Sequence, residues 1–455
     1  MDRGEKLPKT AALCTMGCKV NSYESQGMQE LLEKDGYTIV PFDAPADVYI
    51  INTCTVTQIA ARKSRQMIHR ARAMNEKAIV IAAGCYVDRD DSLIKEGVID
   101  LAVKNSRKAD IIGLIDAYQK GLSEPSSHNR MTISKGDGHT RAFIKIQDGC
   151  RQYCTYCIIP YVRGPLSSRP VEECVEEASV LAKAGFTEVV LTGIHVTSYG
   201  SDLKKQEADP AGKEPLKPVP DLADLILAIS QIEGIERIRL SSLEPTLITE
   251  AFLDKVSQTN KLCPHFHLAL QSGCDKTLKA MNRKYTTNDF RRAVALLRER
   301  YPMVAITTDI IVGFPGETEE DHLASLDFAR EIGFAEGHIF RYSPMEGTVA
   351  ARRKDQIDGN VKKRRSDEML QVVAASTRQF MEGMQHKETQ VLLEEKDEDG
   401  YWTGYTPNYQ HVAVMDFEGA KAGLKVNVRV DGYVEKRSAN HDASGVNTIL
   451  KGVRQ

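Results

Sequence analysis

Apolar positions in the first quarter of the chain alternate between short continuous runs and spaced stripes. The runs TAALCT, DVYIINTC and AIVIAAGC have the length of buried strands. The stretches at residues 21–36 and 58–74 carry apolar residues at the 3.6-residue period of amphipathic helices. Because strands that alternate with helices form parallel sheets, residues 1–124 predict an open parallel α/β domain.

The same alternation resumes after a polar stretch at residues 125–139, which we interpret as a linker. Between residues 143 and 345 lie the strand-like runs FIKIQ, EVVLTG, IRLSS, FHLAL, ITTDIIVG and HIFRY, separated by helical stretches and by a polar loop at 200–220. Six β/α units in succession predict a partial (βα)6 barrel of the TIM type. With a helical connector at its end, this domain covers residues 140–384.

From residue 385 the pattern changes to short β-type segments separated by Gly, Asp and Asn: TQVLLEE, YWTGYT, HVAVMDF, KVNVRVDGYV and TILKGV. We expect a small antiparallel β-barrel over residues 385–453, a class that often binds nucleic acid. Acidic residues outnumber basic ones in this segment, so it lacks the electrostatic signature of an RNA-binding domain.

Composition narrows the class of protein. With 42% hydrophobic and 27% charged residues, the chain has the composition of a soluble globular protein. No apolar run approaches the length of a membrane span, and MDRGEKLPKT lacks the apolar core of a signal peptide. We therefore expect a cytoplasmic protein without a membrane partner.

The charge distribution limits how the chain can bind nucleic acid. A net charge of -3 excludes binding through overall charge, so any such binding depends on local patches. One basic patch lies at residues 352–365, and another places Arg62, Arg65, His69 and Arg72 on one face of a predicted helix. A solvated helix face is the alternative reading of each patch.

Cysteine usage points to metal chemistry, because ten cysteines without a secretion signal favour metal binding or catalysis over disulfides. The segment GCRQYCTYC places Cys150, Cys154 and Cys157 in the loop after the first predicted barrel strand. A structural zinc site built from cysteines, or a fully ligated four-iron cluster, takes four thiolates, so three leave one position for a ligand from outside the protein. A zinc site with a fourth ligand from elsewhere, or buried structural thiols, are the alternatives.

A second set of three cysteines follows the predicted strands of the first domain. Cys18, Cys54 and Cys85 each come at or just after a strand end, and ligands of open α/β sheets bind at that edge. Cys14 lies four residues before Cys18, within the apolar run. We favour Cys18 as the third member, because Gly17 before it gives a sharp turn out of the strand.

Further polar and glycine residues follow the predicted barrel strands, where the chemistry of such barrels lies. Gly193 would let a ligand approach the bare backbone, and Gly313 and Gly316 lie at the mouth after the fifth strand. Turn formation is the alternative reading of each glycine. Candidates for contacts with a cosubstrate or substrate are Ser241, Glu244, Gln271 and Arg341.

The spacing C-x3-C-x2-C resembles that of radical S-adenosylmethionine enzymes, and nearly the whole chain resembles their methylthiotransferase family. The matching segments are GCKVNSYES, NTCTVT, AAGC, GCRQYCTYCIIPYVRG and GYTPNY. The resemblance implies two [4Fe-4S] clusters, one on Cys18, Cys54 and Cys85 and the other on the barrel triplet. It also implies S-adenosyl-L-methionine at the open iron of the barrel cluster and a C-terminal RNA-binding barrel of the TRAM type.

The segments GCKVN, NTCTVT and QSGCDKTLKAMNRKY look most like the branch that acts on N6-threonylcarbamoyladenosine at position 37 of tRNA and makes its 2-methylthio derivative. Within the family, isopentenyladenosine-37 of tRNA and a ribosomal-protein aspartate are alternative substrates. The resemblance implies the anticodon stem-loop of tRNA and an electron donor such as flavodoxin or ferredoxin as partners. The chain departs from the family at Glu346, where a proline is common.

A different class of protein is the main competing hypothesis. A non-catalytic RNA-binding protein with structural metal sites would explain the C-terminal barrel and the basic patches. It would not explain two sets of three thiols, because closed structural sites take four ligands.

Overall fold

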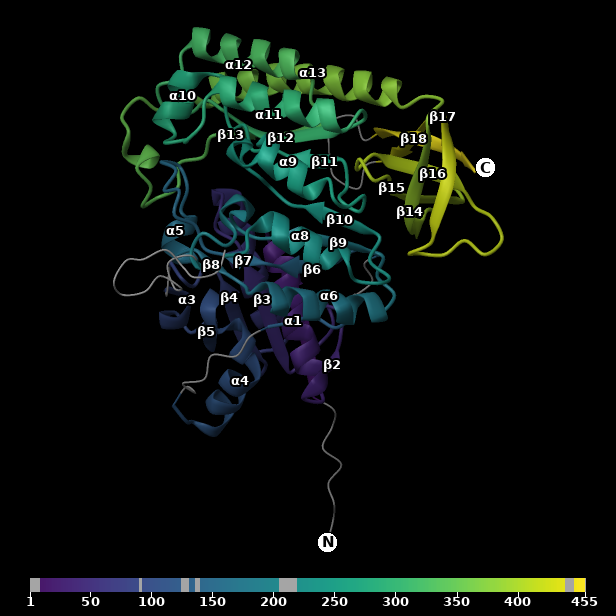
Figure 1. Cartoon of the computed structure of the whole chain (residues 1–455). Coiled ribbons are helices and arrows are strands. Elements are labelled where there is room, and N and C mark those ends of the chain that lie inside the picture. The colour runs from purple at the N-terminus through teal and green to yellow at the C-terminus, as the bar shows by residue number, and fades with distance from the viewer. Residues whose placement is uncertain are drawn as a thin grey trace.

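The computed structural model describes residues 9–89, 92–123, 131–135, 140–203, 219–437 and 446–454. Most of the predicted linker and most of the predicted polar loop at 200–220 lie outside these residues. Figure 1 shows a sheet-and-helix unit in purple and blue, a larger unit in teal and green, and a small yellow barrel beside the larger unit.

A five-stranded parallel sheet, in the order β2-β1-β3-β4-β5, forms the first unit. Its strands are β1 (Thr10–Thr15), β2 (Thr38–Ile39), β3 (Val48–Thr53), β4 (Ile79–Gly84) and β5 (Leu101–Val103). The central strands β1, β3 and β4 are those that the apolar runs predict. The edge strands β2 and β5 are too short to produce a periodic pattern, so the sequence does not predict them.

Helices cover both faces of this sheet. On one face, α1 (Lys19–Lys34) and α4 (Ile111–Lys120) pack Met28, Leu32 and Leu114 into one apolar core. On the other face, α2 (Gln58–Met74) buries Ile68 and Ala71 in a second core. The short helix α3 (Ser92–Lys95) and the 3-10 helix η1 (Asn105–Asp110) complete the unit.

Six parallel strands form the second unit, which confirms the predicted partial barrel. They are β6 (Ala142–Lys145), β9 (Glu188–Thr192), β10 (Arg237–Leu240), β11 (His265–His267), β12 (Ala305–Val312) and β13 (Glu336–Arg341). Two three-stranded sheets, β10-β9-β6 and β11-β12-β13, are joined by parallel bridges from Ile238 to Leu262 and from Leu243 to Leu268. The hairpin of β7 (Gln147–Asp148) and β8 (Ser167–Ser168) encloses the loop that carries the cysteine triplet.

The barrel helices are α5 (Ile159–Val162), α6 (Val171–Lys183), α8 (Leu222–Ser230), α9 (Glu250–Val256), α10 (Asp275–Ala280), α11 (Thr287–Arg300), α12 (Glu319–Ile332) and α13 (Gly359–Gly383), with the 3-10 turns η2 (Val196–Ser198), η3 (Pro245–Leu247) and η4 (Ala350–Arg352). Five of these helices, α8, α9, α11, α12 and α13, begin at a residue whose side chain caps the first turn. Helix α12, for example, starts with a capping box of Thr318 and Asp321 and ends at Gly333 with a φ of 63°. Among the described residues, no helix has both the length and the apolar character needed to cross a bilayer.

Helix α1 joins the first two units, which lie against each other in Figure 1. Tyr23 of α1 donates to Glu177 of α6 across 2.8 Å and to the carbonyl of Met131 across 2.9 Å. Glu30 of α1 accepts from the backbone and hydroxyl of Ser134. The described residues 131–135 of the predicted linker therefore pack along this interface.

The third unit is a closed five-stranded barrel in the order β14-β15-β16-β18-β17. Its strands are β14 (Glu388–Lys396), β15 (Tyr401–Tyr405), β16 (His411–Met415), β17 (Lys425–Arg437) and β18 (Val446–Arg454). Alternate residues such as Val412 and Val414, or Val428 and Val430, fill its core. The expectation of a wholly antiparallel barrel is wrong at one pair, because β16 and β18 run parallel where β18 closes the barrel.

The segment GYTPNY docks this barrel on the second unit. Arg239 of β10 donates to the carbonyls of Pro407 and Thr406 across 2.9 and 3.3 Å, and its guanidinium lies over the ring of Tyr409. Asn408 donates to the carbonyl of Met303 across 3.1 Å. The motif of the last domain is thus part of an internal interface.

Candidate active site

The cysteine triplet lies in the loop between β7 and α5, after the first barrel strand as predicted. Gly149 opens this loop with a φ of 68°, and the Cys150 amide donates to the carbonyl of Gly164. Tyr153 between the thiols has a φ of 50°, and its carbonyl accepts from Asn282 across 3.0 Å. Hydrogen bonds with Gly164 and Asn282 therefore stabilise the strained backbone of the loop that carries the three cysteines.

Polar groups approach the sulfur atoms of the triplet. The backbone amide of Gln152 donates to Cys150 Sγ across 3.4 Å, and Arg283 Nη1 donates to Cys154 Sγ across 3.2 Å. Burial raises the pKa of the Cys157 thiol to about 12, and the neighbouring Cys154 and Cys150 act in the same direction. The thiols are thus mutually close, and binding of a metal would have to displace their protons.

Arg283 connects the triplet to one of the predicted cosubstrate residues. Its second nitrogen, Nη2, lies 2.7 Å from Glu244 Oε1, and His195 Nε2 lies 3.3 Å from the same oxygen. Burial opposes ionisation of Glu244, but His195 and Arg283 outweigh it and lower the pKa of this carboxyl. The sequence prediction includes Glu244 but misses His195 and Arg283. His195 lies two residues after the predicted Gly193, and Arg283 lies in the segment QSGCDKTLKAMNRKY, which carries the family resemblance.

The second set of thiols meets at the strand ends of the first unit. Cys54 and Cys85 directly follow β3 and β4, and Cys18 is the residue before α1. A side-chain carbon at Gly17, where φ is 98°, would stand 2.8 Å from Cys54 Sγ. Burial raises the pKa of the Cys54 thiol to about 11, and Cys85 and Cys18 add to the rise, so the three thiols lie within electrostatic range of one another.

Cys14 stays apart from this group. It lies in β1 opposite Ile51 of β3 and packs against the core beneath α2. Burial raises the pKa of its thiol, and Arg70 is the charge that acts on it, whereas no other cysteine does. This placement favours Cys18 over Cys14 as the third member of the group.

The donor sets fit two multi-iron clusters. All six thiols are free, and amide or guanidinium N–H groups donate to several of their sulfurs, as they do around protein-bound iron-sulfur clusters. Among the described residues, no three His, Cys, Asp or Glu side chains converge tightly enough to hold a single metal ion. Thiolates of a four-iron cluster bind separate irons, so a cluster does not require that convergence.

The other predicted cosubstrate residues fall into two groups. Ser241 is buried at the end of β10, and its hydroxyl has no partner among the described residues. Gln271, whose φ is 66°, is bridged to Ile310 of β12. Both residues follow barrel strands, and the unpaired Ser241 hydroxyl leaves a hydrogen bond for a ligand.

Packing accounts for glycine at three predicted positions. A side-chain carbon at Gly193 would stand 2.8 Å from Gln147 Oε1, which accepts instead from the backbone of His195. Gly313 and Gly316 have φ values of 69° and 77° and lie against residues at and before α13. Arg341, at the end of β13, is exposed. Roles of these four residues in binding stay predictions.

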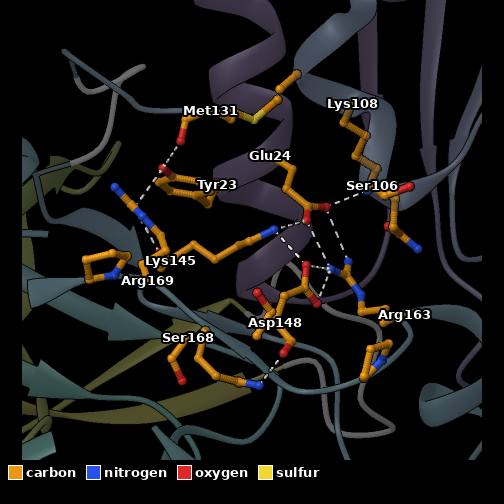
Figure 2. Close-up of a pocket in the computed structure, with 16 residues that line it drawn as sticks. Tyr23, Glu24, Ser106, Lys108, Met131, Lys145, Asp148, Arg163, Ser168 and Arg169 are labelled. Atoms are coloured by element: carbon orange, nitrogen blue, oxygen red, sulfur yellow. Dashed lines mark hydrogen bonds and ion pairs between the residues drawn. The ribbon is translucent and has the colours of Figure 1, made fainter. Parts of the chain in front are cut away.

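A buried ionic cluster lies at the interface of the first two units (Figure 2). Glu24 of α1 meets Lys108, Lys145 across 2.7 Å and Arg163 across 3.0 Å. Burial opposes ionisation, but these three cations outweigh it and hold the pKa of Glu24 well below its usual range. The charge of Arg163 also acts on the Cys54 thiol, where it opposes part of the rise in pKa that burial causes.

One cavity adjoins both thiol groups. It has a volume of about 840 Å³, and its lining includes Thr55, Tyr86 and Ile158, the residues that follow Cys54, Cys85 and Cys157. Cys85 itself packs against Ile158, Val162 and Met345 across the two units. A molecule in this cavity would therefore contact residues that directly follow a cysteine of each thiol group.

The first and second units each match a known protein family. Residues 10–103 match the family described as "Uncharacterized protein family UPF0004", and residues 144–329 match the Radical SAM superfamily. A solved structure, the radical S-adenosylmethionine methyltransferase TsrM from Kitasatospora setae, shares the fold at a TM-score of 0.51 and 16% identity, over 74% of this chain and 75% of that one. The superfamily implies S-adenosylmethionine and a [4Fe-4S] cluster as cofactors.

Relatives resemble this chain over nearly its whole length. "Threonylcarbamoyladenosine tRNA methylthiotransferase MtaB" of Bacillus subtilis is 35% identical over 440 residues, which are 93% of this chain and 94% of the relative. "tRNA-2-methylthio-N(6)-dimethylallyladenosine synthase" of Alkaliphilus oremlandii is 34% identical over 446 residues, 93% of this chain and 90% of the relative. These matches confirm the resemblance carried by the cysteine motifs: the chain belongs to the methylthiotransferase family of radical S-adenosylmethionine enzymes.

Proposed function

We propose that this enzyme converts N6-threonylcarbamoyladenosine at position 37 of tRNA to its 2-methylthio derivative. The names of relatives from Bacillus subtilis, Thermotoga maritima and Aquifex aeolicus, each 35% identical, support this substrate. The observation that carries the proposal is the cavity that adjoins two separate groups of three thiols. The anticodon stem-loop is then the partner in the cytoplasm, and a flavodoxin or ferredoxin is the electron donor.

In this proposal each thiol group holds one [4Fe-4S] cluster. Cys150, Cys154 and Cys157 hold the cluster that binds S-adenosylmethionine, and Ser241 and Glu244 are polar groups available to the cosubstrate. The second cluster is held by Cys18, Cys54 and Cys85. When bound, the cluster on the barrel triplet would supply radical chemistry, and the cluster on Cys18, Cys54 and Cys85 would supply sulfur.

The reaction explains why two cofactor sites are needed. The C2–H bond of adenine is neither acidic nor electrophilic enough for general-base or nucleophilic catalysis at neutral pH, so side chains alone do not suffice. The residues of the chain instead orient the cofactors, donate hydrogen bonds to their sulfurs and exclude water. The base must also leave its stack, which costs least in a single-stranded anticodon loop.

Cysteine variants test the assignment. Each of Cys150→Ala, Cys154→Ala and Cys157→Ala should abolish formation of 5′-deoxyadenosine. Each of Cys18→Ala, Cys54→Ala and Cys85→Ala should retain it with dithionite while losing the methylthio product and about half of roughly eight irons per chain. Cys14→Ala is the matched control and should resemble the parent. A Cys14 variant that loses half the iron, beside a Cys18 variant that keeps it, would reverse the ligand assignment.

Isopentenyladenosine-37 is a second candidate substrate, because relatives named for dimethylallyladenosine are 34% identical over most of the chain. Mass spectrometry of tRNA nucleosides from cells with and without the gene separates the two. Loss of 2-methylthio-N6-threonylcarbamoyladenosine supports the proposal, and loss of the 2-methylthio derivative of isopentenyladenosine supports the second candidate.

A further inference from the structure

Helix α2 presents a basic face at the cavity that is lined by residues next to cysteines of both thiol groups. The helix contains five Lys or Arg residues and no acidic residue. Arg62 and Arg65 line the cavity, are exposed and have no acidic partner within the described part of the chain. Arg72, predicted to share this face, instead pairs with Asp100 across 2.5 Å and belongs to the structure of the first unit.

Exposed apolar side chains surround the same opening. Tyr161 and Ile59, which line the cavity, are 59% and 56% exposed. Tyr153 is 53% exposed, and its ring lies edge-on to that of Tyr161 with a centroid distance of 6.1 Å. Aromatic rings of this kind give unpaired bases a surface on which to stack, while nearby arginines bind the phosphates between those bases.

We infer that helix α2 and Tyr161 form an RNA-binding surface, separate from the C-terminal barrel, that holds the single-stranded part of the anticodon loop over the cavity. The inference rests on the proposed function, since it names the RNA contacts of that same site. In this arrangement Arg62 and Arg65 bind backbone phosphates, and Tyr161 stacks on a base next to the target nucleoside. The target nucleoside enters the cavity between the two thiol groups.

The position of the helix supports an anionic, single-stranded occupant. The start of α2 lines the cavity through Gln58, whose amide also donates to the carbonyl of Pro344 across 2.8 Å. The N-terminal end of a helix carries partial positive charge, which adds to the charge of the two arginines. By contrast, the GYTPNY segment of the C-terminal barrel is used for docking within the chain. An acidic protein segment would satisfy the arginines but would not need the exposed tyrosine rings.

Glu346 partly neutralises this surface. It is 91% exposed at the rim of the cavity and pairs with Arg89 across 2.8 Å. A carboxylate so exposed contributes little to folding, because an exposed ion pair is worth little in water. Its negative charge repels phosphate, however, and its ion pair engages Arg89, the third arginine that lines the cavity. Glu346 therefore weakens RNA binding at this surface.

Charge-removing variants test the arginines. The Arg62→Ala/Arg65→Ala double variant should bind an anticodon stem-loop RNA carrying N6-threonylcarbamoyladenosine roughly tenfold more weakly at 0.1 M salt. Its plot of log affinity against log salt should lose about 1.4 units of slope, because single-stranded RNA contributes about 0.7 per phosphate contact. The Lys63→Ala/Arg70→Ala double variant is the matched control: it removes the same charge from exposed positions of the same helix that do not line the cavity. It should keep the parental affinity and slope.

Two further variants test the ring and the carboxylate. Tyr161→Ala should weaken binding about tenfold and abolish quenching of a 2-aminopurine placed beside position 37, whereas Tyr161→Phe should preserve both. Glu346→Gln should tighten binding two- to fivefold, roughly the value of an exposed ion pair. Glu382→Gln, an exposed position on α13 without an ion pair among the described residues, should leave affinity unchanged. Iron content and the thermal midpoint verify that each variant is folded and loaded.

The outcomes separate this inference from the proposed function. Parental protein that fails to bind the RNA at all overturns the proposed function and the inference together. Parental binding with equal affinity in the Arg62/Arg65 and Lys63/Arg70 variants overturns the inference alone and leaves the C-terminal barrel as the RNA contact. If the Arg62/Arg65 variant keeps the parental salt slope for RNA but loses affinity for an acidic ribosomal-protein segment, the surface binds protein and the inference is wrong.

Discussion

Arg283 Nη1 donates to the sulfur of Cys154 across 3.2 Å, while Nη2 of the same side chain lies 2.7 Å from Glu244 Oε1. The guanidinium is only 7% exposed, and its Nε donates to the Tyr285 hydroxyl across 3.0 Å. Hydrogen bonds to cluster sulfurs and nearby buried charge are two of the means by which a protein sets a cluster potential. Arg283 is therefore placed to tune a cluster held by the triplet.

Arg283→Gln should make that cluster harder to reduce. Loss of the cation removes stabilisation of the electron-rich cluster, so the midpoint potential should fall by tens of millivolts, since 59 mV corresponds to a tenfold change for one electron. Redox titration followed by electron paramagnetic resonance measures the shift. Arg292→Gln, at an exposed position of α11, is the control. An unchanged potential in Arg283→Gln would show that Arg283 is only a packing residue.

Gly17→Ala should remove the second cluster and spare the first. A side-chain carbon there would stand 2.7 Å from Cys54 Cβ and 2.8 Å from Cys54 Sγ, on a backbone with a φ of 98°. Iron content should fall from about eight to about four per chain. Gly36→Ala separates the clash from backbone strain, because Gly36 has a φ of 86° and open space around it. Equal iron in both variants would mean that Gly17 does not shape the thiol group.

The sequence predicts the parts of the fold that have a strong period. Apolar runs and 3.6-residue stripes identify the central strands of the first sheet and all six barrel strands. The two-residue strand β2 and the parallel closure of β18 on β16 depend on long-range pairing, which local periodicity does not encode. The local apolar pattern therefore predicts the architecture, but it does not predict the edge strands of the first sheet or the strand pairing that closes the C-terminal barrel.

The candidate site divides in the same way. Cysteine spacing and strand ends predict where the thiols lie, and the turn at Gly17 favours Cys18 over Cys14, whose thiol lies apart from Cys54 in the structure. The cluster ligands themselves stay a prediction. Arg283 and Arg72 have no such local signal. One reaches a distant thiol and the other a distant carboxylate, across 129 and 28 residues of chain. Their roles follow from tertiary packing alone.

Tyr409→Ala should loosen the C-terminal barrel from the second unit. The Tyr409 ring stacks on Tyr405 at a centroid distance of 4.6 Å and lies tilted against His265 at 4.7 Å, and the Arg239 guanidinium lies over it. Truncation of a packed aromatic ring costs roughly 3–5 kcal/mol. Limited proteolysis should therefore cleave faster between α13 and β14. Tyr433→Ala, at a 43% exposed position of the same barrel, should be cleaved at the parental rate.

Glu24→Gln should destabilise the interface of the first two units. The neutral amide removes the ion pair of the buried Lys108, and it leaves Lys145 and Arg163 with Asp148 as their remaining carboxylate. Breaking a buried charge network costs about 3–5 kcal/mol, because the cations lose their compensation. The thermal midpoint should fall by several degrees. Glu33→Gln removes a carboxylate from a partly exposed pair on the same helix and should change the midpoint little.

The same pair of proteins tests the pH dependence of the ionic cluster. The folded-state pKa of Glu24 lies well below its ordinary value of 4.5, because Arg163, Lys108 and Lys145 outweigh the effect of burial. Protons therefore bind the unfolded chain before they bind the folded one, and the stabilisation by Glu24 is full above the unfolded pKa and lost as pH falls toward the folded value. The difference in thermal midpoint between the parent and Glu24→Gln should be constant above about pH 5.5 and should shrink progressively below about pH 4.5. Midpoints measured at steps from about pH 7 to pH 3.5 give this difference directly. Burial opposes ionisation of Asp148, but Lys145 and Arg163 outweigh it and lower its pKa, whereas Glu24 raises that pKa. Asp148 therefore stays ionised to a lower pH in Glu24→Gln than in the parent, which shrinks the difference in midpoint further at low pH. A difference that grows as pH falls would mean that Glu24 is protonated in the folded protein at neutral pH.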